Sequence, residues 1–168
     1  MKLSTPENQK ENWHVVLSLW NKVVNWQHYG FSDRELSLQL KSLVIYLWSE
    51  KDWLKKRFPS RGKDIEEYIN NSKYIKIVAD LANGIKHGGL DKKPRSDSKQ
   101  TDYFGKVTIN SDKSRYMYYI ESNGEILELF LILRGAIDEY DFVVMQASSN
   151  KQFNKDKKQL VFAPSSLF

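Results

Sequence analysis

Four polar side chains that could do chemistry lie close together near the middle of the chain: Asp80, Asn83, Lys86 and His87. On a helix, Asp80, Asn83 and His87 share one face because they are three and four residues apart. A histidine can act as a general acid or base near neutral pH, and an asparagine can orient it or bind a phosphate. The spacing therefore permits a catalytic or phosphate-binding stripe, although it does not require one. The alternative is the solvated face of an ordinary amphipathic helix, since Lys86 and His87 also suit a helix C-terminus.

The same residues do not predict a metal centre. One histidine and one aspartate that are two helical turns apart supply too few ligands. The chain also has no cysteine. Disulfides, thiol catalysis and cysteine-ligated zinc or iron–sulfur sites are therefore excluded. We expect no metal and no cofactor.

The elements that must position the stripe are predicted to be helical. Apolar residues recur at helical spacing in four segments, which are residues 11–28, 32–58, 63–71 and 73–87. Helix-start signals stand before two of these segments: Ser32 with Glu35 forms a capping box, and Ser72 is the expected N-cap of the fourth helix. Gly88 and Gly89 are expected to end that helix.

The hydrophobic period changes after the fourth helix. Residues 105–109 and 115–121 favour strands, which are joined by a turn at 110–114 into a small hairpin. Asn-Gly at 123–124 favours a second turn. Residues 125–146 are predicted as a long helix, with a third strand over 125–133 as the alternative. The helix would turn one apolar stripe to the core: Ile126, Phe130, Leu133, Ile137 and Tyr140.

The fold class predicted from these segments is mainly α, a helical bundle with a small antiparallel β-hairpin before the long C-terminal helix. We expect a single domain over residues 1–148. Residues 149–168 are expected to be a tail, partly disordered, in which the apolar QLVF at 159–162 could dock. The chain begins without the apolar run of a signal peptide and contains no apolar stretch long enough to span a bilayer. A cytoplasmic protein that does not enter the membrane is therefore expected.

Charge gives one indication of the partner. The chain carries a net charge of +5, which favours an acidic partner such as RNA. The alternative is a lysine-rich surface that needs no partner, because lysine and arginine are spread along the whole sequence.

The segment ANGIKH at 82–87 resembles the R-N-x-x-x-H motif of HEPN domains, which are small helical-bundle proteins common in bacterial defence and toxin–antitoxin systems. Asn83 and His87 match two motif positions, and Ala82 stands at the arginine position. In that family the arginine and histidine act together in metal-independent RNA cleavage, commonly across a dimer interface. The resemblance therefore implies a homodimer, and RNA, a nucleotide or a partner protein as the ligand.

Alanine cannot bind the scissile phosphate as the family's arginine does. The sequence therefore favours a non-catalytic, defence-related binding or accessory module, with Asp80, Asn83, Lys86 and His87 as its binding residues. The first alternative is a metal-independent ribonuclease in which His87 and Asn83 are catalytic and Lys86 or Arg134 supplies the missing cation. The second is a purely structural or interaction protein in which His87 only caps a helix.

Overall fold

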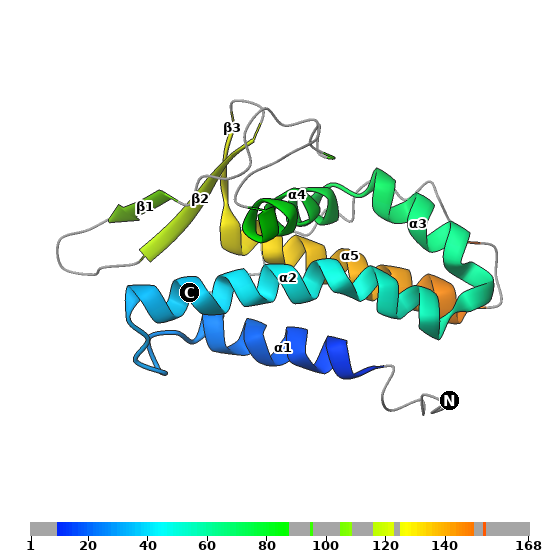
Figure 1. Cartoon of the computed structure of the whole chain (residues 1–168), viewed down its shortest axis with the longest axis horizontal. Helices are drawn as coiled ribbons and strands as arrows, with labels where there is room; N and C mark the ends of the chain where they lie inside the picture. Colours follow the sequence, from blue (N-terminus) through cyan, green and yellow to red (C-terminus); the bar gives the residue numbers. More distant parts are fainter. Residues whose placement is uncertain are drawn as a thin grey trace.

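The computed structural model of the protein describes residues 10–87, 95, 105–108, 116–122, 125–149 and 153. Of these, residues 105–108, 116–122 and 125 are described by their backbone only. The described part is mainly helical, as the sequence predicts, and carries one small antiparallel sheet before the last helix. The helices run side by side as a bundle and the sheet lies at one end of it (Figure 1).

Helices α1 (Glu11–Val24) and α2 (Asp33–Arg57) form an antiparallel pair along one side of the bundle (Figure 1). The first helix ends four residues earlier than the predicted 11–28, because the chain turns back before α2. Gly30 has φ +64°, a left-handed conformation that favours glycine, and it completes the turn. The predicted capping box opens α2: the Ser32 hydroxyl accepts from the Glu35 N–H, and the Glu35 carboxylate accepts from the Ser32 N–H.

A short 3-10 helix at Pro59–Arg61 leads into α3 (Gly62–Asn71), which is followed by α4 (Tyr74–His87). The predicted capping role of Ser72 is wrong. Its buried hydroxyl donates to the Ile69 carbonyl at 2.7 Å and so caps the end of α3. The start of α4 is capped by a residue distant in sequence, described below. Gly88 and Gly89 lie outside the described residues.

The sheet has three strands, β1 (Gly105–Thr108), β2 (Tyr116–Ser122) and β3 (Glu125–Glu128), in the order β1-β2-β3. The first pair is the predicted hairpin, with Lys106 opposite Tyr118. The second pair adds the strand that the sequence offered only as an alternative, with Ile120 opposite Leu127. The turns predicted at 110–114 and 123–124 lie outside the described residues.

Helix α5 (Leu129–Ser148) begins directly after β3, so the predicted helix is wrong over its first four residues. Glu128 ends the strand and caps the helix, because its carboxylate accepts from the N–H groups of Phe130 and Leu131 at 2.9 and 2.8 Å. Ile126, predicted to face the core, is 73% exposed because it belongs to the strand. The rest of the predicted stripe does face inward, and Leu133 and Tyr140 are fully buried.

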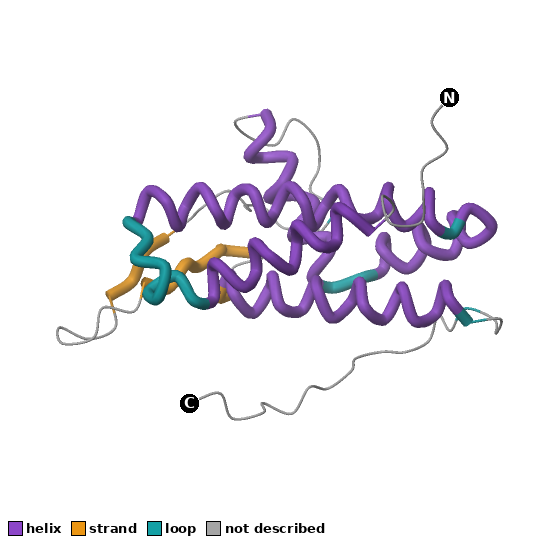
Figure 2. The backbone as a smooth tube through the Cα atoms, turned by 90° about the horizontal axis from the view of Figure 1, so that it is seen from below, coloured by secondary structure: helices purple, strands orange, loops and turns teal. Residues whose placement is uncertain are grey.

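One hydrophobic cluster joins all the helices and holds the bundle together. It includes fully buried leucines of α2, the inward face of α5 and the apolar face of α4. It also takes in Phe153, whose ring packs edge-on against Tyr68 with the Arg61 guanidinium 5.5 Å from its centre. Within the described part of the chain, no helix is both long enough and apolar enough to cross a membrane. Helix α5 packs against α2, α3 and α4, and the strands lie together at one end of the bundle (Figure 2).

Candidate functional site

The position of α4 is fixed at its first turn by contacts from α5. The Glu139 carboxylate accepts from the N–H groups of Lys73, Tyr74 and Ile75 at 2.9 to 3.2 Å, which satisfies donors that a helix start leaves unpaired. Burial raises the pKa of Glu139, and these three N–H groups oppose that rise. One turn earlier on α5, Gly135 lies under the Tyr74 ring, so close that an added Cβ would overlap the ring carbons. The two contacts set the orientation of the polar residues that follow.

Asp80 does not belong to an exposed stripe. It is buried, with 2% of its surface exposed, and its carboxylate accepts from the backbone N–H of Arg95 at 2.7 Å. The helix does place it on the same side as Asn83 and His87, as the spacing predicts, but the carboxylate is used to hold the chain beyond α4. Asp80 therefore serves as an anchor in this structure.

Asn83, Lys86 and His87 lie in the last turns of α4, where Asn83 is half-buried and the other two are exposed. The helix rise puts His87 about 10 Å along the axis from Asp80, too far for Asp80 to orient its imidazole. No described residue forms a hydrogen bond or ion pair with the His87 side chain. The structure thus separates the predicted site into one buried anchor, Asp80, and a helix end with one half-buried and two exposed residues.

Ala82, at the arginine position of the HEPN motif, is fully buried in the core cluster. A side chain here points into the bundle, whereas His87 is exposed to solvent at the helix end. Of the two cations that could replace the arginine, Arg134 pairs with Asp138 on α5, its Nε lying 3.2 Å from both carboxylate oxygens. Lys86 is exposed in the same turn as His87 and is free of any ion pair with the described residues.

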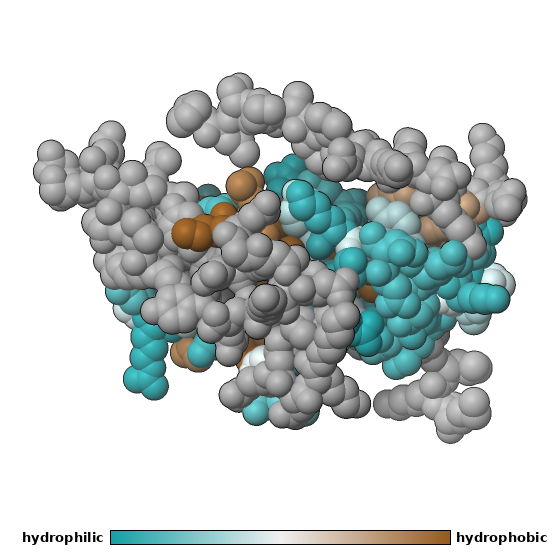
Figure 3. Space-filling model, turned by 90° about the horizontal axis from the view of Figure 1, so that it is seen from above, coloured by the Kyte–Doolittle hydropathy of each residue, from teal (hydrophilic) through white to brown (hydrophobic). Residues whose placement is uncertain are grey.

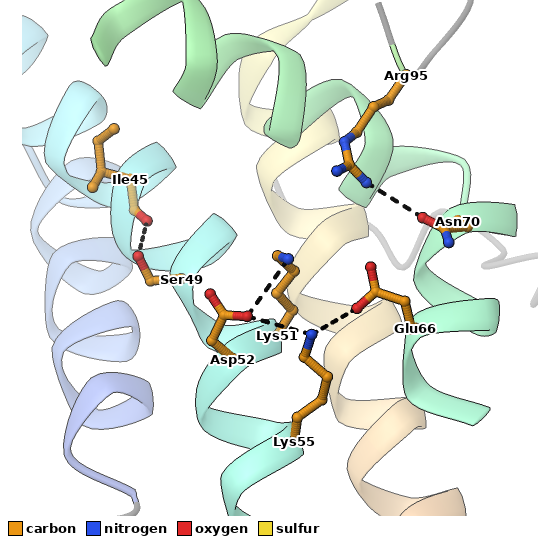
Figure 4. Close-up of polar contacts among 8 residues, drawn as sticks. All are labelled: Ile45, Ser49, Lys51, Asp52, Lys55, Glu66, Asn70 and Arg95. Atoms are coloured by element: carbon orange, nitrogen blue, oxygen red, sulfur yellow. Dashed lines mark hydrogen bonds and ion pairs between the residues drawn. The ribbon is translucent and has the colours of Figure 1, made fainter. Parts of the chain in front are cut away.

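Arg95 is the residue that sequence reasoning missed. Its guanidinium lies over the Trp48 ring of α2, 4.9 Å from the ring centre, and donates to the Asn70 side chain of α3 at 3.3 Å (Figure 4). Together with the bond to Asp80, these contacts bring Arg95 onto α2, α3 and α4 at once. No local signal around Arg95 could have revealed this role, because these three contacts are with segments distant in sequence.

Two lysines of α2 lie in the same region as Arg95 and Trp48. Lys51 places its ammonium 4.6 Å from the centre of the Trp48 ring. Lys55 bridges Asp52 at 3.5 Å and Glu66 of α3 at 2.8 Å (Figure 4). The hydrogen bond from Lys55 lowers the pKa of Glu66 and raises that of Lys55, so both stay charged near neutral pH. The positive charges here are largely balanced by neighbouring carboxylates, and the cluster ties α2 to α3.

A second buried polar group joins α1 to α2. Glu50 is fully buried and accepts from the Asn12 amide at 2.6 Å and from the Arg57 guanidinium at 3.3 Å. Burial raises its pKa, and the contacts with Asn12 and Arg57 oppose that rise. Because Arg57 neutralises the carboxylate and Asn12 fixes its position, the arrangement suits helix packing.

The described surface on the side of α3 and α4 is mostly hydrophilic (Figure 3). Among the described residues, no group of three or more His, Asp or Glu side chains is placed to hold a metal ion. In comparisons with known proteins, no family model, no curated protein and no solved structure matches this chain. The resemblance to HEPN domains therefore rests on the residues of the motif alone.

Proposed function

We propose that the protein is a non-catalytic, HEPN-like binding module that contacts RNA through the exposed end of α4, formed by Asn83, Lys86 and His87. The observation that supports this most directly is the contrast between two motif positions. Ala82 is fully buried while Lys86 and His87 are exposed. The motif thus retains polar contact residues but offers no position for the phosphate-binding arginine.

The expected lack of catalysis rests on groups that His87 does not contact among the described residues. General acid–base catalysis by histidine is more effective when a partner fixes the ring, and a positioned cation stabilises the charge that develops on a scissile phosphate. Asp80 is committed to the Arg95 N–H, and Arg134 is committed to Asp138. Lys86 can bind a phosphate, yet it is a flexible point charge without the fixed fork of an arginine.

RNA is the ligand that charge favours. The net charge is +5, and Lys86 with His87 forms an exposed donor pair beside the Asn83 amide. The negative end of the helix dipole lies at this point, so it offsets part of the attraction for phosphate. Binding is therefore expected to be weak and strongly dependent on salt. The defence-related accessory role implied by the resemblance is compatible with this proposal but is not needed for it.

The test measures binding and cleavage of the same fluorescent single-stranded RNA. We expect no cleavage with or without EDTA, and binding by anisotropy that weakens as salt rises. Lys86→Ala should reduce the slope of log K against log salt by about 0.7, the value for one phosphate contact with single-stranded nucleic acid. Lys63→Ala is the matched control, because Lys63 is an exposed lysine of α3 and should leave the slope unchanged.

Two outcomes would contradict the proposal in different ways. Cleavage that disappears in His87→Ala, in a variant that keeps its helical circular dichroism, would establish the ribonuclease instead. Absence of RNA binding at low salt, or equal effects of Lys86→Ala and Lys63→Ala, would remove RNA as the ligand of this helix end. In that case a structural or protein-binding role would be favoured.

A further inference from the structure

One face of α5 carries five residues whose chemical types follow an order along the helix. Met145, Asp141 and Asp138 lie at or beyond the middle of α5, whereas Arg134 and Leu131 lie nearer its start. Steps of three and four residues put them on one face, here called the outer face of α5. Leu131 is 67% exposed and Met145 55%, so the described residues leave both side chains largely uncovered. The face is therefore complementary to a segment that enters at the end of α5 and carries cations before apolar side chains.

The acidic part of this face holds a charge that the described residues do not balance. Asp138 accepts from Arg134, whose Nε lies 3.2 Å from both carboxylate oxygens. By contrast, no described residue forms a hydrogen bond or an ion pair with the Asp141 carboxylate. Burial raises the pKa of Asp141, the charge of Asp138 raises it further, and Arg134 opposes the rise. A cation next to Asp141 would therefore reduce the repulsion between the two aspartates.

The chain itself returns to this face after the helix. Phe153, five residues beyond the end of α5, is 4% exposed, and its ring centre lies 6.0 Å from that of Tyr68. The Tyr68 ring in turn lies 5.4 Å from Phe142, which is six residues before the end of α5. The chain has therefore turned back along α5 by Phe153. Phe142 adjoins the outer face, because Asp138 and Met145 are four and three residues from it.

The residues that follow Phe153 have the order that the outer face requires. Residues 154–158, NKDKK, carry three lysines and one aspartate, and residues 159–162, QLVF, carry three consecutive apolar side chains. A segment that runs back along α5 meets the aspartates first and Leu131 afterwards. The cations would thus lie beside the acids, and the apolar side chains would lie beside the exposed leucine.

The length of the segment agrees with this order. Leu131 lies eleven residues before Phe142, which is about 16 Å along the helix axis. Leu160 lies seven residues after Phe153, and seven residues of extended chain span at most about 23–25 Å. The surplus of about 7–9 Å is available for the step from Tyr68 onto α5. Leu160 can therefore reach Leu131 without any movement of the bundle.

We propose that residues 154–162 bind along the outer face of α5, antiparallel to the helix. The lysines then lie beside Asp141 and Asp138, and the apolar residues 160–162 pack on Leu131. Because Phe153 ties the segment to the bundle, the contact is intramolecular, and an effective concentration in the millimolar range makes weak contacts sufficient. The end of α4 takes no part in this contact, so the inference does not depend on the proposed RNA binding.

Trypsin cleavage after the lysines of 154–158 in the full-length chain tests the proposal. Cleavage follows the population in which the segment is released, so Leu131→Asp should speed it at least about fivefold. Asp141→Asn should speed it by about twofold, as expected for one partly exposed ion pair. Leu38→Asp is the matched control, because Leu38 of α2 is 54% exposed and lies outside the outer face of α5.

Mass spectrometry identifies the cut sites, and circular dichroism checks that each variant keeps its helices. Equal cleavage rates in the wild type, Leu131→Asp and Leu38→Asp would overturn the proposal. Faster cleavage in Leu17→Asp but not in Leu131→Asp would also overturn it, because the segment would then lie on α1, where Leu17 is 42% exposed.

Two introduced cysteines test the position of the segment, because the native chain has none. Leu131→Cys combined with Leu160→Cys should form a disulfide within one chain under mild oxidation, since a disulfide needs Cα atoms within about 7 Å. Leu38→Cys combined with Leu160→Cys is the control and should be oxidised at least about tenfold more slowly. Equal rates for the two pairs would overturn the proposed position. A disulfide that joins two chains would overturn it as well, because the outer face would then be covered by a second copy.

Discussion

The two halves of α4 differ in what surrounds them, although both carry polar residues at the same spacing. The first half, from Tyr74 to Ala82, is held by Glu139, packed over Gly135 and tied through Asp80 to Arg95. The second half, from Asn83 to His87, is half-buried to exposed. The difference shows that helical spacing alone does not separate a structural polar residue from one available for binding. Burial and the identity of the hydrogen-bond partner make that distinction.

The largest effect that would test this contrast is expected from Ala82→Arg. In the family's pattern this change restores the motif, but in this structure it forces a long charged side chain into the core. We expect a loss of about 3–5 kcal/mol in the free energy of unfolding, from overpacking and a buried charge. Urea denaturation of the variant beside Lys86→Arg, which should be neutral, measures it. A stable Ala82→Arg protein would mean that this position opens to solvent.

A smaller loss is expected when the anchor of the first half is removed. Asp80→Ala leaves the Arg95 N–H without its acceptor, which should cost about 1–3 kcal/mol. Asn83→Ala, one turn along the same face, is the comparison and should cost less than about 1 kcal/mol, because the half-buried Asn83 side chain forms no hydrogen bond with the described residues. Thermal denaturation of both variants measures the two losses of stability. Equal losses would show that the two residues share one environment.

Two glycines test the packing of the same two halves. Gly135→Ala on α5 should destabilise by about 1–2 kcal/mol, because the new methyl group overlaps the Tyr74 ring. Gly84→Ala in α4 meets no atom within 4 Å and should stabilise by up to about 1 kcal/mol, through the better helix propensity of alanine. Opposite signs in chemical denaturation are therefore expected. Stabilisation by both changes would show that α4 does not pack closely on α5.

The smallest effect on stability is expected from His87→Ala. The imidazole is exposed at the helix end, and changes at exposed positions usually alter stability by less than about 0.5 kcal/mol. We expect a loss of that size or less in the free energy of unfolding, measured by urea denaturation. A larger loss would mean that His87 has a structural contact and would weaken its assignment to a binding surface.

Much of the fold could be predicted from local sequence signals. The capping box at Ser32, the amphipathic α4 and the change of period after Gly105 all depend on neighbouring residues, and the structure confirms the elements they predict. The start of the last helix was placed too early, because Ile126 fits a helical period as well as a strand. The capping role of Glu128 could not be predicted from the sequence, because it depends on where β3 ends and α5 begins.

The candidate site was harder to predict, since its contacts are between residues distant in sequence. The start of α4 is capped by Glu139 and not by the expected Ser72, and Glu139 lies 65 residues after Tyr74, whose N–H it accepts from. Arg95 reaches Asp80, Asn70 and Trp48, and none of these pairings leaves a pattern in one sequence. The spacing of Asp80, Asn83 and His87 was predicted, but their different burial depends on which neighbours cover each one.

Phe153 sets a practical limit on how the protein can be handled. It lies five residues beyond the end of α5, yet it is 4% exposed and its ring stands against Tyr68, which in turn stacks at a tilt on Phe142. A chain shortened to the end of that helix would uncover these aromatic rings and make the protein prone to aggregation. Affinity tags, fusion partners and C-terminal truncations should therefore begin beyond residue 153.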